Sequence, residues 1–137
     1  MTEEEFWEIV DSALIDSASP FFLEDHYLSY WNTLAALPVE KLAAFAFVHS
    51  EIKQRASASN LPQVPIVLNQ GWSDDDIQNL LTGLISRGYK VFSDFLRDAE
   101  GTLQSIDRPL LLIKCEAFEY APHAIQGERT AGLLPDQ

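Results

Sequence analysis

The sequence predicts an all-α protein, folded as a single compact bundle of about six helices. Apolar residues recur at three- and four-residue steps along most of the chain, which is the period of an amphipathic helix. Glycine and proline are few, and they fall mainly at the boundaries of these periodic stretches. The 137 residues have the length of one domain, and with 47% of them hydrophobic they supply enough apolar mass for a core.

The first predicted helix begins at a capping box, in which Thr2 and Glu5 satisfy free amides of the first turn. Its apolar stripe follows the helical period and consists of Phe6, Ile9, Val10, Ala13 and Leu14. Ser19-Pro20 breaks this helix, and a second is expected over about 22–36. The apolar face of that second helix consists of Leu23, Tyr27, Tyr30, Trp31 and Leu34.

A third helix is expected to start at Leu37-Pro38, because a proline near the first helical position loses no helical hydrogen bond. Its period continues through Leu42, Phe45, Val48 or His49, and Ile52. Residues 57–62 are typical of a loop. Residues 63–70 fit either a short strand or a short helix that starts at Pro65. We expect the helix, because a single strand has no obvious partner in this chain.

The second half of the chain begins with a helix that Ser73 caps and that Gly88 follows as the C′ residue. Its buried stripe is expected to be Ile77, Leu80, Leu81, Leu84 and Ile85. The next helix should end at Gly101, with Val91, Phe92, Phe95 and Leu96 facing inward. Residues 110–113 could form a strand, but Phe118 extends them at helical spacing, so we expect a last helix. The ordered domain is expected over 1–125, followed by a loose polar tail over 126–137.

Four short patterns stand in order along the chain. They are Phe6-Trp7-x-Ile9-x-Asp11, Leu34-x-x-Leu37-Pro38-x-Glu40-x-Leu42-x-x-Phe45, Asn69-Gln70-Gly71-Trp72-Ser73-Asp74-Asp75 and Leu84-Ile85-x-x-Gly88-x-x-x-Phe92. Together they resemble a family of small bacterial proteins known only as a domain of unknown function. The resemblance implies a compact helical domain and no established reaction. The chain departs from the family's pattern at Gln70, where a glycine is expected, and at Pro62 and Pro65.

The charge of the chain is concentrated at one end. The first forty residues hold nine acids and no lysine or arginine, whereas the rest hold 12 acids and nine bases, so most of the net charge of −12 belongs to the beginning. These early acids are Glu3, Glu4, Glu5, Glu8, Asp11, Asp16, Glu24, Asp25 and Glu40. Such a surface repels nucleic acid and anionic membranes and attracts a basic protein.

This asymmetry favours a non-enzymatic interaction domain, such as an immunity protein or antitoxin that neutralises a basic toxin. The rim that meets the partner would consist of Glu4, Glu8, Asp11, Glu24 and Asp25. Trp72 would be the aromatic anchor if it is exposed, because tryptophan is enriched in binding hot spots. The simpler interpretations are that Trp72 fills a junction between helices and that the acids form a solvated helix face.

The alternative is a small-ligand or metal-binding enzyme with its site at the turn 69–75. Asn69, Ser73, Asp74 and Asp75 would supply the polar groups, with Asp75 as a base. Successive helical residues point about 100° apart, so adjacent aspartates do not converge on one ion. Helix capping and the helix dipole explain these aspartates without a ligand, and we therefore predict no metal and no cofactor.

Other catalytic arrangements have little support in the sequence. His26, His49 and His123 are far apart and form no metal-ligand spacing, and Cys115 lies in an apolar stretch where cysteine is usually inert. We therefore predict that the protein is not an enzyme. A single cysteine excludes an internal disulfide framework, and the chain shows neither a signal peptide nor a membrane-spanning run. A cytoplasmic location is the expectation.

Overall fold

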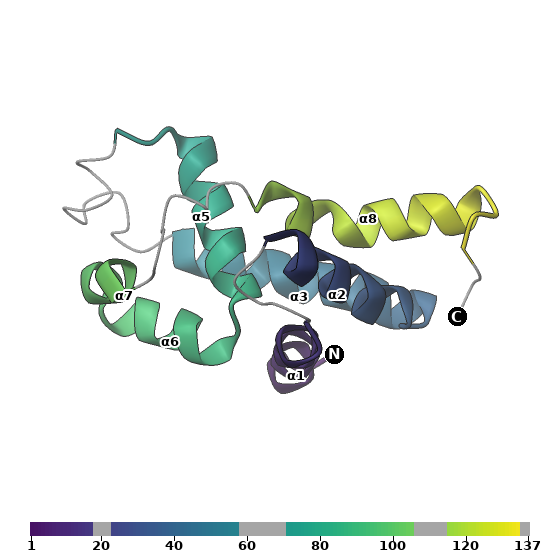
Figure 1. Cartoon of the computed structure of the whole chain (residues 1–137), viewed down its shortest axis with the longest axis horizontal. Helices are drawn as coiled ribbons and strands as arrows, with labels where there is room; N and C mark the ends of the chain where they lie inside the picture. Colours follow the sequence, from purple (N-terminus) through teal and green to yellow (C-terminus); the bar gives the residue numbers. More distant parts are fainter. Residues whose placement is uncertain (18–22, 58–70, 106–114, 135–137) are drawn as a thin grey trace.

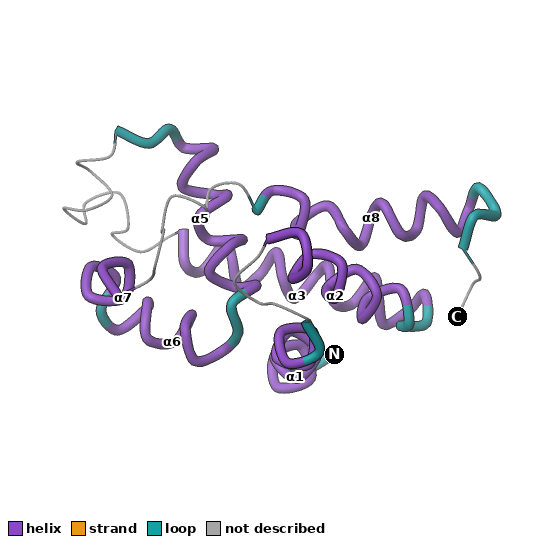
Figure 2. The backbone as a smooth tube through the Cα atoms, viewed as in Figure 1, coloured by secondary structure: helices purple, strands orange, loops and turns teal. Residues whose placement is uncertain are grey.

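The computed structural model describes residues 1–17, 23–57, 71–105 and 115–134, and within these ranges it contains seven α-helices and no β-strand (Figures 1 and 2). The helices are α1 (Glu3–Ile15), α2 (Leu23–Ala35), α3 (Val39–Ser57), α5 (Asp74–Ser86), α6 (Tyr89–Arg97), α7 (Ala99–Ser105) and α8 (Glu116–Thr130). The all-α fold class is confirmed, with one helix more than the predicted six or so. Within the described ranges, every helix is too short or too polar to cross a membrane.

The helices form a bundle elongated in one direction (Figure 1). Helices α2, α3 and α8 run along the long axis, and α8 packs on both of the others. Helix α1 is seen nearly end-on below them and contacts α2 and α3. Helices α6 and α7 lie together at one end, and α5 connects this end to the long helices by contacts with α1, α3, α6 and α8.

Helix α5 is the most deeply buried element among the described residues. Every residue from Leu80 to Ser86 is buried, including the polar Thr82 and Ser86. The Thr82 hydroxyl donates to the carbonyl of Gln78 at 3.2 Å, and the Ser86 hydroxyl donates to that of Gly83 at 2.7 Å. Because these hydroxyls bond to their own helix, they can be buried without leaving a polar group unsatisfied.

Aromatic rings join helices that are far apart in the sequence. Phe6 of α1 stacks on Phe45 of α3, with ring centroids 4.7 Å apart. Tyr30 of α2 meets the edges of Phe45 and of Phe118 in α8. Such pairs add about 0.5–1.5 kcal/mol each to the stabilisation from burial alone. Most of the apolar residues predicted to face inward on the first three helices therefore meet in one core, where Val48 and His49 of α3 are both buried. Leu14 is only partly buried, and the side chain of Leu23 lies outside the described ones.

The predicted helix boundaries agree with the structure where a side chain or a glycine defines them. The Thr2 hydroxyl accepts the amide of Glu5 at 3.1 Å. Ser73 and Asp76 form a reciprocal capping box, in which each side chain accepts the other residue's amide. Gly88 follows the C-cap of α5 with φ of 100°, a left-handed conformation that favours glycine.

Two predictions for the second half of the chain were wrong. Leu96 does not face inward but is 55% exposed, because the core covers only the side of α6 that carries Phe92 and Phe95. Gly101 does not end a helix. Instead, α6 ends at Arg97 and α7 runs through Gly101, whose amide donates to the Asp98 carboxylate at 3.0 Å. The segments 63–70 and 110–114, for which strand and helix were both considered, lie outside the described residues.

The last helix continues past residue 125, where the loose tail was expected to begin. Helix α8 runs to Thr130, and Arg129 near its end is buried. The Arg129 guanidinium donates to the carbonyls of Ala35 at 2.9 Å and Leu37 at 2.6 Å, which lie at the end of α2. A helix end leaves carbonyls without intrahelical donors, so Arg129 satisfies groups that α2 cannot satisfy itself. Polar composition alone gave no sign of this long-range contact.

Replacing Arg129 by methionine should therefore cost about 1–3 kcal/mol of unfolding free energy, because two partly buried carbonyls lose their charged donor while the apolar stem is kept. Urea denaturation followed by circular dichroism measures this loss. Arg97→Met is the matched control, since Arg97 is exposed and its ion pair among the described residues is a surface contact with Asp94. It should change stability by less than about 1 kcal/mol. Equal losses in the two variants would contradict the assigned role of Arg129.

Candidate protein-interaction surface

The structure brings three of the predicted rim residues together beside two aromatic rings. Glu4, Glu8 and Asp11 of α1 line an open hollow of about 460 Å³. We call this the acidic hollow, and its lining residues are Glu3, Glu4, Trp7, Glu8, Asp11 and Tyr89. Helical spacing explains the grouping, because residues three and four apart lie on the same side of α1. Tyr89, the first residue of α6, was not predicted from the sequence.

The carboxylates of α1 are not equivalent. Glu3 pairs with Arg55, and Glu5 lies 3.9 Å from the ammonium group of Lys41. Both pairs are exposed, so each contributes no more than about 1 kcal/mol. Glu4 and Glu8 are exposed, and neither has an ion pair with any described residue. The negative potential of the hollow therefore comes mainly from Glu4, Glu8 and Asp11, none of which has an ion pair with a described residue.

Asp11 has a structural partner inside the fold. Its carboxylate accepts the backbone amide of Tyr89 at 3.0 Å, across 78 residues of sequence. Helix α6 needs this acceptor, because its N-cap is Gly88, which has no side chain to cap the first turn. A Cβ atom at Gly88 would lie 2.6 Å from the same Asp11 oxygen, so the glycine also makes room for the contact. Asp11 therefore joins α1 to α6.

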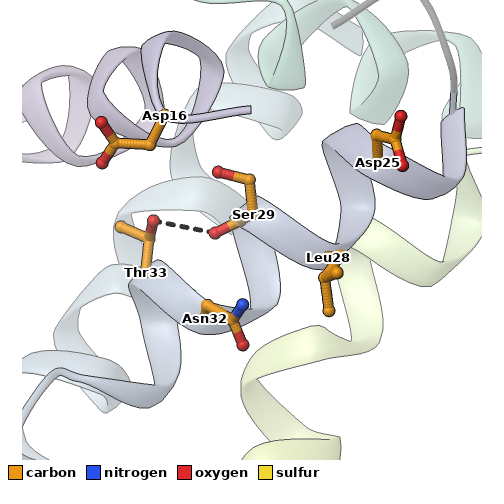
Figure 3. Close-up of a pocket in the computed structure, with 6 residues that line it drawn as sticks. All are labelled: Asp16, Asp25, Leu28, Ser29, Asn32 and Thr33. Atoms are coloured by element: carbon orange, nitrogen blue, oxygen red, sulfur yellow. Dashed lines mark hydrogen bonds between the residues drawn. The ribbon is translucent and has the colours of Figure 1, made fainter. Parts of the chain in front are cut away.

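The other two rim residues, Glu24 and Asp25, do not join the acidic hollow. Asp25 lines a separate groove of about 420 Å³ between the end of α1 and α2, and Glu24 is exposed nearby on the first turn of α2. Figure 3 shows Asp16 and Asp25 on either side of Ser29 in this groove. The Ser29 hydroxyl donates to the carbonyl of Ala13 at 2.6 Å and ties the two helices together. The predicted acids thus occupy two surfaces rather than one.

Trp72 does not line the acidic hollow. It is only partly exposed and packs against the core. It lies two residues before α5, whose first turn is on the opposite side of the molecule from α1 (Figure 1). The interpretation that Trp72 fills a junction between helices agrees with this packing. Its predicted role in partner binding stays a prediction.

The alternative ligand site is only partly within the described residues. Asn69 lies outside them. Ser73 is engaged in the capping box with Asp76, while Asp74 and Asp75 are exposed in the first turn of α5. Across the four described ranges, no group of three or more His, Cys, Asp and Glu side chains is arranged to hold a metal ion. The aspartates here have a structural explanation in helix capping.

The buried histidines belong to the core. His26 packs on Phe118, and His49 packs beside Phe6 and Phe45. Burial is the main reason that the pKa of each imidazole falls from 6.5 to about 4. The charge of Arg87 adds to this effect at His26. At His49 the charge of Lys53 lowers the pKa further, and Glu119, which accepts from Lys53 at 2.6 Å, opposes it.

Cys115 is buried at the start of α8. Burial raises the pKa of its thiol to about 11, partly offset by Arg87. A thiol that stays protonated at neutral pH is a poor nucleophile. The cysteine and the two buried histidines therefore have the character of core residues and not of a catalytic group.

Comparison with known proteins assigns the chain to one family. Residues 1–125 match a family described as proteins of unknown function, DUF4240, and the chain belongs to that family. The match confirms the resemblance to a domain of unknown function and names no enzymatic activity. Comparison with curated proteins and comparison with solved structures each gave no match.

Replacing Asp11 by alanine should lower the unfolding free energy by about 1 kcal/mol, because α6 loses the acceptor for its first amide. Amide hydrogen exchange at Tyr89 should accelerate in the same variant. Glu8→Ala is the control on the same helix, and this exposed change should cost less than about 0.5 kcal/mol. If Asp11→Ala leaves both stability and Tyr89 exchange unchanged, the contact between α1 and α6 does not have the role assigned to it.

Acid should destabilise the protein through His26 and His49. Because their folded-state pKa lies below 6.5, the unfolded state binds more protons. Their contribution to stability is therefore complete above about pH 6.5 and is lost as the pH falls toward 4, by about 2 kcal/mol for each histidine at pH 5. His49→Gln should flatten the pH dependence of urea denaturation between pH 7.5 and 5. His123→Gln, at an exposed position, should not, and an unchanged slope for His49→Gln would contradict this prediction.

Proposed function

We propose that this protein is a non-enzymatic interaction domain whose acidic first helix binds a basic protein. Glu4 and Glu8 support this proposal most directly. They are exposed on one side of α1, lie beside Trp7 and Tyr89 in the acidic hollow, and have no ion pair within the described part of the chain. Carboxylates that have no ion pair among the described residues remain available for a partner.

In its most specific form, the proposal is that the partner is a cationic toxin such as a nuclease. The protein would neutralise this toxin as an immunity protein or antitoxin does. The net charge of −12 supports this version, because a strongly acidic surface can imitate the charge of a nucleic-acid substrate. A bacterial cytoplasmic location is part of the same proposal. The enzyme alternative at residues 69–75 has less support, since capping already accounts for Ser73 and Asp76.

Electrostatic attraction predicts a specific kinetic behaviour. The chain, used as an affinity bait at low salt in its native host, should retain a basic protein. The association rate of that purified partner should fall steeply as ionic strength rises, because salt screens exposed charges. Glu4→Gln with Glu8→Gln should slow association by about tenfold with little effect on thermal stability. Stopped-flow fluorescence measures these rates.

The matched control is Asp74→Asn with Asp75→Asn, which removes the same charge from the opposite side of the molecule. Both pairs are exposed residues of a first or second helical turn. The control should change the association rate by less than about twofold, because the removed charges lie on the first turn of α5, away from α1 (Figure 1), and salt screens charges that are distant from the contact. An association rate indifferent to salt, or equal effects of the two double variants, would refute the proposal.

A further inference from the structure

A second hollow adjoins the acidic one and has a more apolar lining. It measures about 290 Å³ and lies between α1, α3 and α6. Its lining residues are Glu3, Trp7, Ile52, Arg55, Ala56, Tyr89, Phe92, Ser93 and Leu96. Glu3, Trp7 and Tyr89 line both hollows, so the two form one continuous surface. We call this surface the α1–α6 groove.

Two large side chains in the groove are more than half exposed. Tyr89 is 54% exposed and Leu96 is 55% exposed, at opposite ends of α6. Between them, buried Trp7 and Phe92 form the floor, with ring centroids 5.5 Å apart, and the Tyr89 ring packs edge-on against Trp7 at 5.6 Å. An aromatic and an aliphatic side chain that flank an apolar hollow are typical of a contact where a partner's apolar side chain is buried.

The charge beside this apolar floor determines what kind of segment can bind. Glu4 and Glu8 stand next to Trp7 and Tyr89, so a lysine or arginine there would meet carboxylates and the faces of aromatic rings together. Arg55 gives an intramolecular example of the carboxylate contact, since it lines the hollow and its guanidinium pairs with Glu3. An acidic segment would be repelled, and so would the acidic α1 of a second copy of this chain.

We propose that the α1–α6 groove binds a basic segment that carries an apolar anchor. The anchor, an aliphatic or aromatic side chain, enters the hollow floored by Trp7 and Phe92 and covers Leu96 and Tyr89. Flanking lysine or arginine side chains pair with Glu4 and Glu8. This inference rests on the proposed function, because it specifies where on the acidic protein a basic partner docks and which second feature the partner must have.

Selection of random 16-residue peptides displayed on phage, with the full chain as bait, tests which kind of segment binds the α1–α6 groove. The enriched peptides should combine two or more lysines or arginines with a Leu, Ile, Phe or Trp. Leu96→Ser together with Tyr89→Ala should weaken binding of the synthesised peptides by about tenfold or more, because the apolar contact is lost. Leu28→Ser is the matched control, since Leu28 is 60% exposed on α2 and lines the other groove.

The control should change peptide affinity by less than about twofold, and thermal unfolding should show that all variants remain folded. Failure to enrich any peptide, enrichment of neutral or acidic peptides, or a larger effect of Leu28→Ser would overturn the inference. Association rates measured with the partner from the native host distinguish a failure of this inference from a failure of the proposed function. If Glu4→Gln with Glu8→Gln slows association of that partner but Leu96→Ser with Tyr89→Ala does not, the acidic interaction is supported and the proposed binding site in the α1–α6 groove is wrong.

Discussion

The complete burial of the second half of α5 is the constraint on which the rest of this fold depends. A helix that is buried all round needs neighbours on every side. Here α1, α3, α6 and α8 supply them. The segment Leu80–Ser86 tolerates this environment because its polar hydroxyls bond to the helix itself. Packing around α5 therefore fixes where α1 and α6 stand relative to each other, and with them the groove that they share.

The acids of α1 show how one charged helix can serve both folding and binding. Asp11 supplies the acceptor that α6 lacks at Gly88, so its charge is used inside the fold. Glu3 and Glu5 are partly neutralised by Arg55 and Lys41, in exposed pairs of low energy. The negative surface that is available to a partner is therefore smaller than the net charge of −12 suggests. Aromatic side chains from α1 and α6 border it.

Polar groups from α8 complete the interior of the bundle. Glu119 accepts from the buried Lys53 of α3, next to His49, and Arg129 donates to carbonyls at the end of α2. A buried charge is costly unless it is paired or hydrogen-bonded. Lys53 is paired with Glu119, whereas only one nitrogen of Arg129 donates to the carbonyls and its other two nitrogens are buried without a hydrogen bond among the described residues. Helix α8 thus holds the long helices together through polar contacts as well as through Phe118. The neutral buried histidines make the same interior sensitive to acid.

The sequence by itself determined the helical fold class, the core faces of the first three helices and the caps at Thr2, Ser73 and Gly88. These features depend on residues within a turn or two of each other, so periodicity and capping chemistry reveal them. Only the tertiary structure decided which acids share a surface, that Asp11 is engaged by α6, and that Trp72 packs on the core away from α1. It also decided that Leu96 and Tyr89 are exposed and that Arg129 is buried. Each of these outcomes depends on contacts between residues far apart in the chain. The packing of the helices around α5 sets the geometry of these contacts, and no local sequence pattern encodes it.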